Sequence, residues 1–473
     1  MGTAAAAAAA SVSASTNYTS GLSKTDHEMI KSHIIDIPKE TPALLGSKCC
    51  IYSVPDYLRK TNPKAYSPQL ISIGPIHYRQ KKRMLMEKQK HIYFYFFWDR
   101  LAKTHTSEKC QELLGGYKSF LEKNEEHIRY HYSQQFPNIK KDAFVGMMLF
   151  DSVFIMELFL RKSSEEDYKD DYMFSKLWVK EGIWLDLLLL ENQIPMFVLK
   201  KLYETVVLKG NEKTVHATFV DLARQYFKSF YDSSDRTKSS NWKLAMHFTD
   251  LVRYSYIPFP KTTSYSGPLK YDDVKSAIQL KKSGICFEAS RSGILSDVKF
   301  EGRKFFFPLL EYLPMKRFEP RFVIPQLKVE LSTESVLRNI IAFEQCHYRN
   351  QPQVSNYVSL LDALIETPED LDFLVANKVL VHQLGSDKEI GLLISDLSKD
   401  IATNGNFNTM IDDLNKHHDK KWHRAMTKLR LVYFQDVWRG SSTLVGLLVL
   451  FFTFYNFYRS IHPNKPSVKL FTI

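Results

Sequence analysis

The sequence predicts a mainly α protein: one large helical domain with a small β element and one C-terminal transmembrane helix. Three features support this prediction. Of the 473 residues, 44% are hydrophobic and 13% aromatic, which fits a folded globular chain rather than a polytopic transporter or a disordered scaffold. Apolar residues recur at helical spacing in the region beyond Thr333. An uncharged apolar run from Gly440 to Tyr458 lies close to the C-terminus.

Changes in composition along the chain predict how it is divided. The leader is of low complexity, with alanines at positions 4–10, and no basic residue precedes them as one would in a signal peptide. The predicted parts are a flexible leader (1–45), a helical domain (46–435) with an internal linker or surface loop (232–241), a transmembrane helix (438–459) and a short tail (460–473).

The first segment of the domain, residues 51–78, is predicted to be extended and rich in turns, with only short helical pieces. Proline has no backbone N–H and clashes with a preceding helical turn, so a long helix is forbidden here by Pro55, Pro63, Pro68 and Pro75. Helices are expected next, at about 79–105 and 108–135.

Two further apolar stretches, 144–160 and 183–199, approach the length of a membrane span. Each contains two acids, which are costly near the centre of a bilayer; they are Asp151 and Glu157, then Asp186 and Glu191. Pro195 also interrupts the second stretch. Both stretches are therefore predicted to be core helices of the domain.

A small sheet is predicted at 322–331, where the sequence reads FVIPQLKVEL. Later, Thr367 followed by Pro368 predicts a capped helix start. A capping box is predicted for the next helix, from Ser386 and Glu389.

The C-terminal helices are expected to follow closely on one another. Asn404 and Gly405 are predicted to end the helix that begins at Ser386. Another helix is expected from about Thr409, running on into the transmembrane helix and coupling the domain rigidly to the bilayer.

The apolar run near the C-terminus has the length and flanks of a transmembrane helix. As a helix it would be about 28 Å long, close to the roughly 30 Å of a bilayer core. Arg439 and Arg459 bracket it, and aromatic rings lie near both ends, where the headgroups would be. The alternative is a buried core helix, which fits the tight basic flanks less well. Residues of the predicted span include Gly440, Gly446, Phe451 and Tyr458.

Basic residues predict the orientation of this span. Those before it are Lys420, Lys421, Arg424, Lys428, Arg430 and Arg439, whereas those after it are Arg459, Lys465 and Lys469. The excess predicts a cytoplasmic domain and an outside or lumenal tail. The plasma membrane is the favoured location. Ser442 and Gly446 form a small-xxx-small pair, which indicates a homodimer through this helix.

The net charge of +12 suggests nucleic acid or an anionic membrane as a partner. No zinc finger, RNP motif or basic zipper accompanies it, so membrane lipid is expected and nucleic acid is not. A second basic cluster is interpreted as a solvated helix face; it comprises Arg79, Lys81, Lys82, Arg83, Lys88 and Lys90. The five cysteines lack zinc spacing and indicate reduced thiols.

No signature of a nucleotide-binding, hydrolase, metalloprotease or kinase site occurs in the chain, so no catalytic, cofactor-binding or metal-binding residue is predicted. Glu344 and His347 have the spacing of a bundle metal site, but such sites need a second copy of the pair, and helix cross-linking is the better interpretation. The polar triplet from Glu191 to Gln193 is likewise interpreted as a buried hydrogen-bond network that satisfies helix ends.

Four blocks of the sequence resemble an uncharacterised plant family, the domain-of-unknown-function family number two hundred and forty-seven. These blocks are 51–77, 148–158, 186–199 and 324–347. The residues that carry the resemblance most clearly are Pro55, Gly74, Pro75, Glu191, Asn192, Pro195, Glu344, Gln345 and His347. The resemblance implies a plant source and a single-pass membrane protein. It brings no established catalytic residues, and some grass members are implicated in pollen-side self-incompatibility.

The predicted function is therefore a C-terminally anchored membrane protein that acts in protein interaction, recognition or signalling. Its expected partners are the lipid bilayer and other proteins, with no cofactor. The alternative is an enzyme of unknown chemistry that uses polar groups near Glu191 and Glu344. If these side chains converged on a pocket, the enzyme would be favoured.

Overall fold

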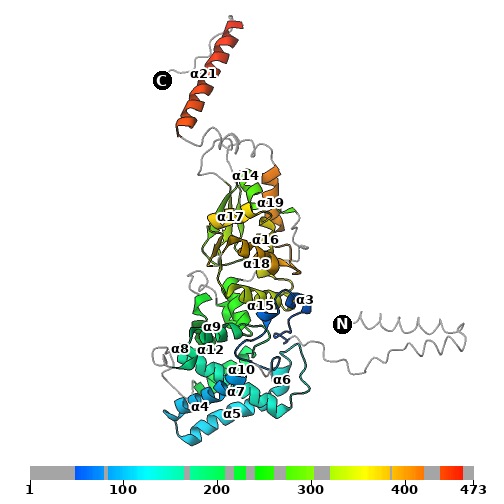
Figure 1. The fold of residues 1–473 in the computed structure, drawn as a ribbon, viewed down its shortest axis with the longest axis vertical. Coiled ribbons are helices and arrows are strands. Elements are labelled where there is room, and N and C mark those ends of the chain that lie inside the picture. Colours follow the sequence, from blue (N-terminus) through cyan, green and yellow to red (C-terminus); the bar gives the residue numbers. More distant parts are fainter. Residues whose placement is uncertain are drawn as a thin grey trace, which may run out of the picture. The chain divides into compact units, whose positions relative to one another are not determined.

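In the computed structural model, the structure describes residues 48–78, 84–163, 171–207, 218–230, 240–259, 273–302, 320–383, 386–419 and 437–461 (Figure 1). The predicted leader lies outside these residues. So do the predicted linker up to residue 239, the tail from residue 462, and the connection at 420–436 that was expected to be helical.

The described chain is mainly helical, as predicted. Its first half contains α3 (Asp56–Arg59), η1 (Pro63–Tyr66), α4 (Met84–Ala102), α5 (Ser107–Lys123), α6 (Glu125–Arg129), α7 (Lys141–Ser163), α8 (Tyr172–Ser175), α9 (Leu177–Asp186), α10 (Met196–Leu202), η4 (Tyr203–Val207), α12 (Phe219–Tyr226) and η5 (Lys228–Phe230). Its second half contains η6 (Asn241–Leu244), α13 (Phe248–Tyr256), α14 (Ala277–Lys282), α15 (Thr333–Cys346), α16 (Gln353–Leu364), α17 (Pro368–Ala376), α18 (Asp387–Ser398), α19 (Asn408–Asp419) and α21 (Val437–Ile461). The strands are β1 (Cys286–Ser290), β2 (Lys299–Glu301), β3 (Arg321–Pro325), β4 (Leu327–Val329) and β5 (Leu380–His382).

The predicted core helix at 144–160 is confirmed as α7, around which α4, α5, α10 and α12 pack (Figure 1). It is the one helix of the described residues found long and apolar enough to cross a membrane, and 78% of its most apolar window is buried inside the protein. Its buried acids are paired: Asp151 lies 2.6 Å from the Lys90 ammonium, and Glu157 accepts hydrogen bonds from Arg100. Paired charges make this helix suited to a protein core.

The interpretation of the basic cluster at 79–90 as a solvated face is wrong for Lys90. Lys88 is exposed, but Lys90 is 3% exposed and binds both Asp151 and the carbonyl of Ser72. Burial lowers the pKa of Lys90, and the neighbouring carboxylates Asp151 and Glu87 more than reverse this effect. Residues 79–83 lie outside the described part of the chain.

Two predicted helices are divided in the structure. The stretch 183–199 is buried, but α9 ends at Asp186 and α10 begins after Pro195, with an irregular turn between them. The helix expected at 108–135 is broken at Asn124, whose side-chain amide donates to the carbonyl of Phe120 and closes α5. An asparagine competes for backbone groups in this way at helix ends.

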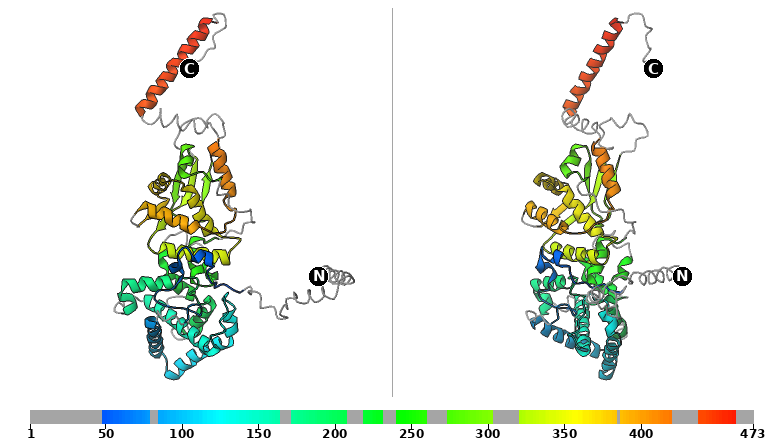
Figure 2. Two further views of the ribbon diagram at one scale, coloured as in Figure 1. Left: turned by 45° about the vertical axis from the view of Figure 1, so that its right-hand side comes forward. Right: turned by 90° about the vertical axis from the view of Figure 1, so that its right-hand side faces the viewer.

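The predicted sheet at 322–331 is confirmed, as two adjacent strands in two small sheets. In one sheet β3 pairs with β1 in parallel and with β2 antiparallel. In the other, β4 pairs with β5 in parallel. Helices α15, α16 and α18 gather beside the strands, as the yellow to orange ribbons show in both views of Figure 2.

The predicted helix start at Thr367 is confirmed, with a complete capping box between Thr367 and Asp370. The capping box predicted at Ser386 is wrong: α18 begins there, but the Ser386 side chain makes no capping hydrogen bond. Residues 404–405 do not end α18, which stops earlier, at Ser398. The chain then turns through Asp400 with a φ of 58°.

Helix α21 covers the predicted span at Gly440–Tyr458 and has 25 residues. From residue 448 to 461 every side chain is exposed, including Phe451 at 65% and Tyr458 at 54%. A Cβ added at Gly446 would have nothing within 4 Å. The apolar side chains from residue 448 to 461 therefore lie unburied, in contrast to those of α7.

Candidate functional site

The residues of the predicted motif blocks hold the extended segment 51–78 in place. This segment contains only the short helices α3 and η1, as predicted, so most of its backbone N–H groups cannot bond within a helix or sheet. Buried N–H groups need acceptors elsewhere. Three side chains of the α9–α10 turn provide them, and we call these the motif clamp: Asp186, Glu191 and Asn192.

Asp186, the last residue of α9, accepts three backbone hydrogen bonds. The donors are the N–H groups of Gln69, at 2.8 Å, and of Leu70 and Ile71, at 2.6 and 2.8 Å. The carboxylate is 2% exposed. A negatively charged acceptor forms stronger hydrogen bonds than a neutral one. The Asp186 side chain therefore holds three consecutive backbone N–H groups in place.

Glu191 binds three partners from the extended segment. It accepts from the N–H of Val54 at 2.7 Å and from the Arg59 guanidinium, and it lies 3.1 Å from Nε2 of His77. Burial on its own would raise the pKa of Glu191, but the hydrogen bonds with His77, Val54 and Arg59 outweigh it and lower the pKa. The carboxylate is held ionised by the chain itself.

Asn192 and Gln193 complete the predicted hydrogen-bond network. The Asn192 side chain accepts from the N–H of Ile73 at 2.6 Å and donates to the carbonyls of Ile71 and Asp186. The Gln193 side chain instead donates to backbone carbonyls of its own turn. It also accepts from the N–H of Phe248 at the start of α13.

Gly74 and Pro75 form the tight turn that closes the segment. Gly74 has a φ of 70°, and a Cβ at this position would lie 2.6 Å from the carbonyl oxygen of Gln193. Its N–H donates to Asp151 at 2.8 Å, and the carbonyl of Pro75 accepts from the N–H of Tyr78. Glycine is required here for both conformation and space.

Glu344, in α15, forms a second buried network. Its carboxylate accepts from the N–H groups of Val354 and Ser355 at 3.1 and 2.9 Å, and so caps α16. It also pairs at 3.1 Å with Arg253 of α13, and both side chains are fully buried. This side chain therefore caps one helix and cross-links another, as the sequence indicated.

Gln345 and His347 also make structural contacts. Gln345 exchanges two hydrogen bonds, both 2.8 Å, with the backbone of Ala402. His347 caps the end of α15, and its Nδ1 lies 2.9 Å from the Tyr52 hydroxyl in the extended segment. Burial lowers the pKa of His347. Both motif blocks therefore bind the segment that contains Pro55, the residue before α3.

A buried group at the start of α13 was not predicted from the sequence. His247 caps this helix by accepting from the N–H of Asp250, and its Nε2 lies 3.0 Å from the carbonyl of Cys50. Burial lowers the pKa of His247 to about 3 and raises that of Asp250 to about 6. The sequence signal was a capping residue followed three residues later by an acid. Histidine is seldom the capping residue in this pattern.

The described side chains do not include a group of three or more His, Cys, Asp or Glu residues that could hold a metal ion. Glu344 and His347 in particular have different partners, Arg253 for the first and Tyr52 for the second.

A family model described as a plant protein of unknown function, DUF247, matches residues 51–452. The chain belongs to this family. The match begins at the extended segment, includes every motif residue discussed above and ends inside α21. In this DUF247 protein the motif residues therefore form hydrogen bonds and ion pairs that hold segments of the domain together.

Two relatives from Arabidopsis thaliana are similar to this DUF247 chain over most of their length. The UPF0481 protein At3g47200 is 28% identical, with 88% of this chain and 87% of the relative covered. The putative UPF0481 protein At3g02645 is 21% identical, with 85% and 88% covered. No solved structure matches the chain.

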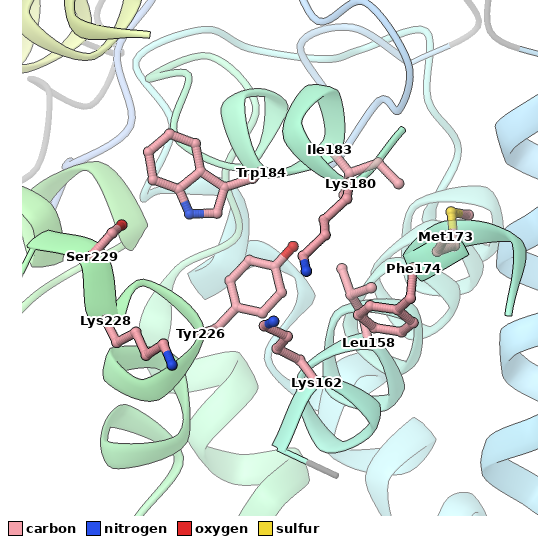
Figure 3. Close-up of a pocket in the computed structure, with 10 residues that line it drawn as sticks. All are labelled: Leu158, Lys162, Met173, Phe174, Lys180, Ile183, Trp184, Tyr226, Lys228 and Ser229. Atoms are coloured by element: carbon pink, nitrogen blue, oxygen red, sulfur yellow. The ribbon is translucent and has the colours of Figure 1, made fainter. Parts of the chain in front are cut away.

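Two cavities in the described part of this DUF247 chain lie apart from the motif residues. One, of about 220 Å³, is lined by residues of α7, α8, α9, α12 and η5 (Figure 3). The other, of about 580 Å³, is more open and is lined by Tyr57, Lys60, Thr61, Asp396, Lys399 and Asp400. Neither Glu191 nor Glu344 is among the residues that line these two cavities.

Proposed function

We propose that this protein is a single-pass membrane protein, anchored by its C-terminal helix, whose helical domain acts in protein interaction, recognition or signalling. The observation that carries the proposal is the exposed apolar surface of α21, where Leu448, Phe451 and Phe454 are 50–65% exposed. At about 1.5 Å per residue the 25 residues of this helix are as long as a bilayer core is thick, although among the described helices only α7 was found both long and apolar enough to cross a membrane. Exposed apolar surface of this extent indicates a lipid or protein partner.

The orientation proposed is a cytoplasmic domain with an outside or lumenal tail, at the plasma membrane. Its support is the excess of basic residues on the domain side of α21, from Lys420 to Arg439. These residues would also attract anionic lipid headgroups.

The anchor is tested by alkaline carbonate washing of membranes that contain the full-length protein. We expect the protein to stay in the pellet, and its release into the supernatant would refute the anchor. The orientation is tested with a glycosylation sequon appended to the tail. We expect modification there and none at the natural sequon of Asn17, and the reverse pattern would invert the proposal.

The interaction role draws its support from how the motif residues are used. Glu191 and Glu344 accept hydrogen bonds from backbone N–H groups and pair with arginines. Their carboxylates therefore stabilise the domain and are not left to bind a substrate. These contacts of Glu191 and Glu344 do not support the enzyme alternative. Proximity labelling in the tissue of origin would identify partners, and a homodimer through the face of Gly446 would be detected by cross-linking in membranes.

A further inference from the structure

The cavity between α7, α9 and α12 combines apolar walls with cationic groups (Figure 3). Its floor consists of Leu158, Met173 and Ile183, each at most 2% exposed. Its walls include Phe174 and Trp184, and the Trp184 ring stacks on Phe230 at 5.1 Å between centroids. A rigid apolar lining of this kind is typical of small-molecule sites.

The charged groups that line the cavity are all cations, which favours an anion as the ligand. Three of the ten lining residues are lysines, namely Lys162, Lys180 and Lys228, and no acid is among the ten. Figure 3 shows the ammonium end of Lys180 next to the Tyr226 hydroxyl and that of Lys162 below the Tyr226 ring. Such donors bind a carboxylate more strongly than they bind a neutral group.

Tyr226 gives the second, independent indication of a ligand. Its side chain is 8% exposed and its ring stacks on Phe159 at 4.2 Å. Among the described residues its hydroxyl has no hydrogen-bond partner, although it points into the cavity (Figure 3). The hydroxyl is accessible from the cavity, so a ligand bound there would supply its hydrogen-bond partner.

We propose that this cavity binds a small aromatic carboxylate, one ring in size. The ring would lie against Trp184 and Phe174, and the carboxylate would accept hydrogen bonds from the Tyr226 hydroxyl and the lysine ammonium groups. The volume agrees, because an apolar cavity of about 150 Å³ already holds benzene, and this one is about 220 Å³. The proposal goes beyond the membrane anchor and does not depend on it.

Binding is tested by calorimetry on the full-length protein in detergent, with phenylacetate and its neutral analogue phenylacetamide as probes. We expect phenylacetate to bind in the millimolar range or tighter, and at least about tenfold more tightly than the amide, because each strong polar contact is worth about tenfold. Equal binding of the two probes, or no binding of phenylacetate, would overturn the proposal.

Variants then locate the site. Lys162 and Lys180 have other contacts as well, so the test uses Tyr226→Phe, which keeps the ring, and Lys228→Gln, on the exposed side of the cavity. Each is expected to weaken phenylacetate binding about tenfold. The matched control is Lys118→Gln, an exposed lysine of α5, which should leave binding unchanged. If the Tyr226 variant fails to fold, Lys228→Gln decides alone, and unaltered binding in that variant would place the ligand elsewhere.

Discussion

At the residue scale, position 74 requires glycine for two reasons, the backbone conformation there and the space that its neighbours leave. Its φ is 70°, and a Cβ would meet the carbonyl oxygen of Gln193 at 2.6 Å, which is backbone and cannot rotate away. We expect Gly74→Ala to lower the free energy of unfolding by about 1–3 kcal/mol, the usual cost of a strained residue. Urea unfolding followed by circular dichroism measures the change.

The chain offers a matched control for this substitution. Gly115 lies inside α5, and a Cβ there would meet nothing within 4 Å. Gly115→Ala should therefore raise the free energy of unfolding by about 0.5–1 kcal/mol, because alanine loses less conformational entropy than glycine in a helix. Two changes of the same sign would contradict this account of Gly74.

His247 predicts a pH dependence whose sign follows from its lowered pKa. In the folded state the pKa is about 3, so His247 is neutral there, whereas the unfolded chain takes up a proton below its ordinary value of 6.5. The stability is therefore complete above pH 6.5 and is lost progressively as the pH falls toward 3.

We expect His247→Asn to reduce this loss, because asparagine can still accept from the N–H of Asp250 but does not titrate. Between about pH 7.5 and about pH 5 the wild type should lose about 2 kcal/mol more of its unfolding free energy than the variant. Urea midpoints at the two pH values measure the difference, and equal losses would exclude His247 as the titrating group.

At the scale of the element, Glu344, near the end of α15, provides the N-terminal cap of the next helix, α16. Glu344→Gln removes the charge that faces Arg253, which is fully buried, and turns one acceptor oxygen into a donor beside the α16 N–H groups. Breaking a buried pair by removing one partner costs about 3–5 kcal/mol. We expect a loss of this size, with faster hydrogen exchange at Val354 and Ser355.

The comparison for this variant is Glu112→Gln. Glu112 is 69% exposed and pairs with Lys109 on the surface of α5. Exposed pairs contribute little to stability, so the unfolding midpoint should stay at the wild-type value. A similar loss in both variants would show that the charge change, and not the buried contact, was responsible.

Helix ends were predicted correctly where residues adjacent in the sequence are enough to form the cap. Thr367 with Pro368 and Asp370 specifies a complete cap within four residues, and the cap forms. Ser386 has the same kind of signal, but its side chain makes no capping bond. The end of α18 was missed because it depends on Asp400, which adopts a positive φ that its residue type permits but does not require.

At the scale of the whole molecule, the sequence predicted which residues belong to the motif blocks, but not which residues they contact. Prolines showed that the segment 51–78 could not form a long helix. Its acceptors, however, lie more than a hundred residues further on, in Asp186 and Asn192. No local pattern encodes such a pairing, and so the motif clamp emerged only from the structure.

The anchor can be separated from the folded domain by one substitution in α21. Leu448 is 50% exposed and lies near the centre of the predicted span. Relative to leucine, a lysine at the centre of a span makes insertion less favourable by about 3–4 kcal/mol. Leu448→Lys should therefore sharply reduce glycosylation of a sequon appended to the tail, and should release protein from carbonate-washed membranes.

A leucine of the domain provides the matched control for this effect. Leu392, in α18, is 59% exposed, so Leu392→Lys makes the same chemical change on a surface that is not proposed to enter lipid. It should leave insertion at the wild-type level. Both variants should keep the melting temperature of the domain, because neither side chain is buried in it. If Leu448→Lys inserted as well as Leu392→Lys, the exposed surface of α21 would have to be assigned to a protein partner instead of the bilayer.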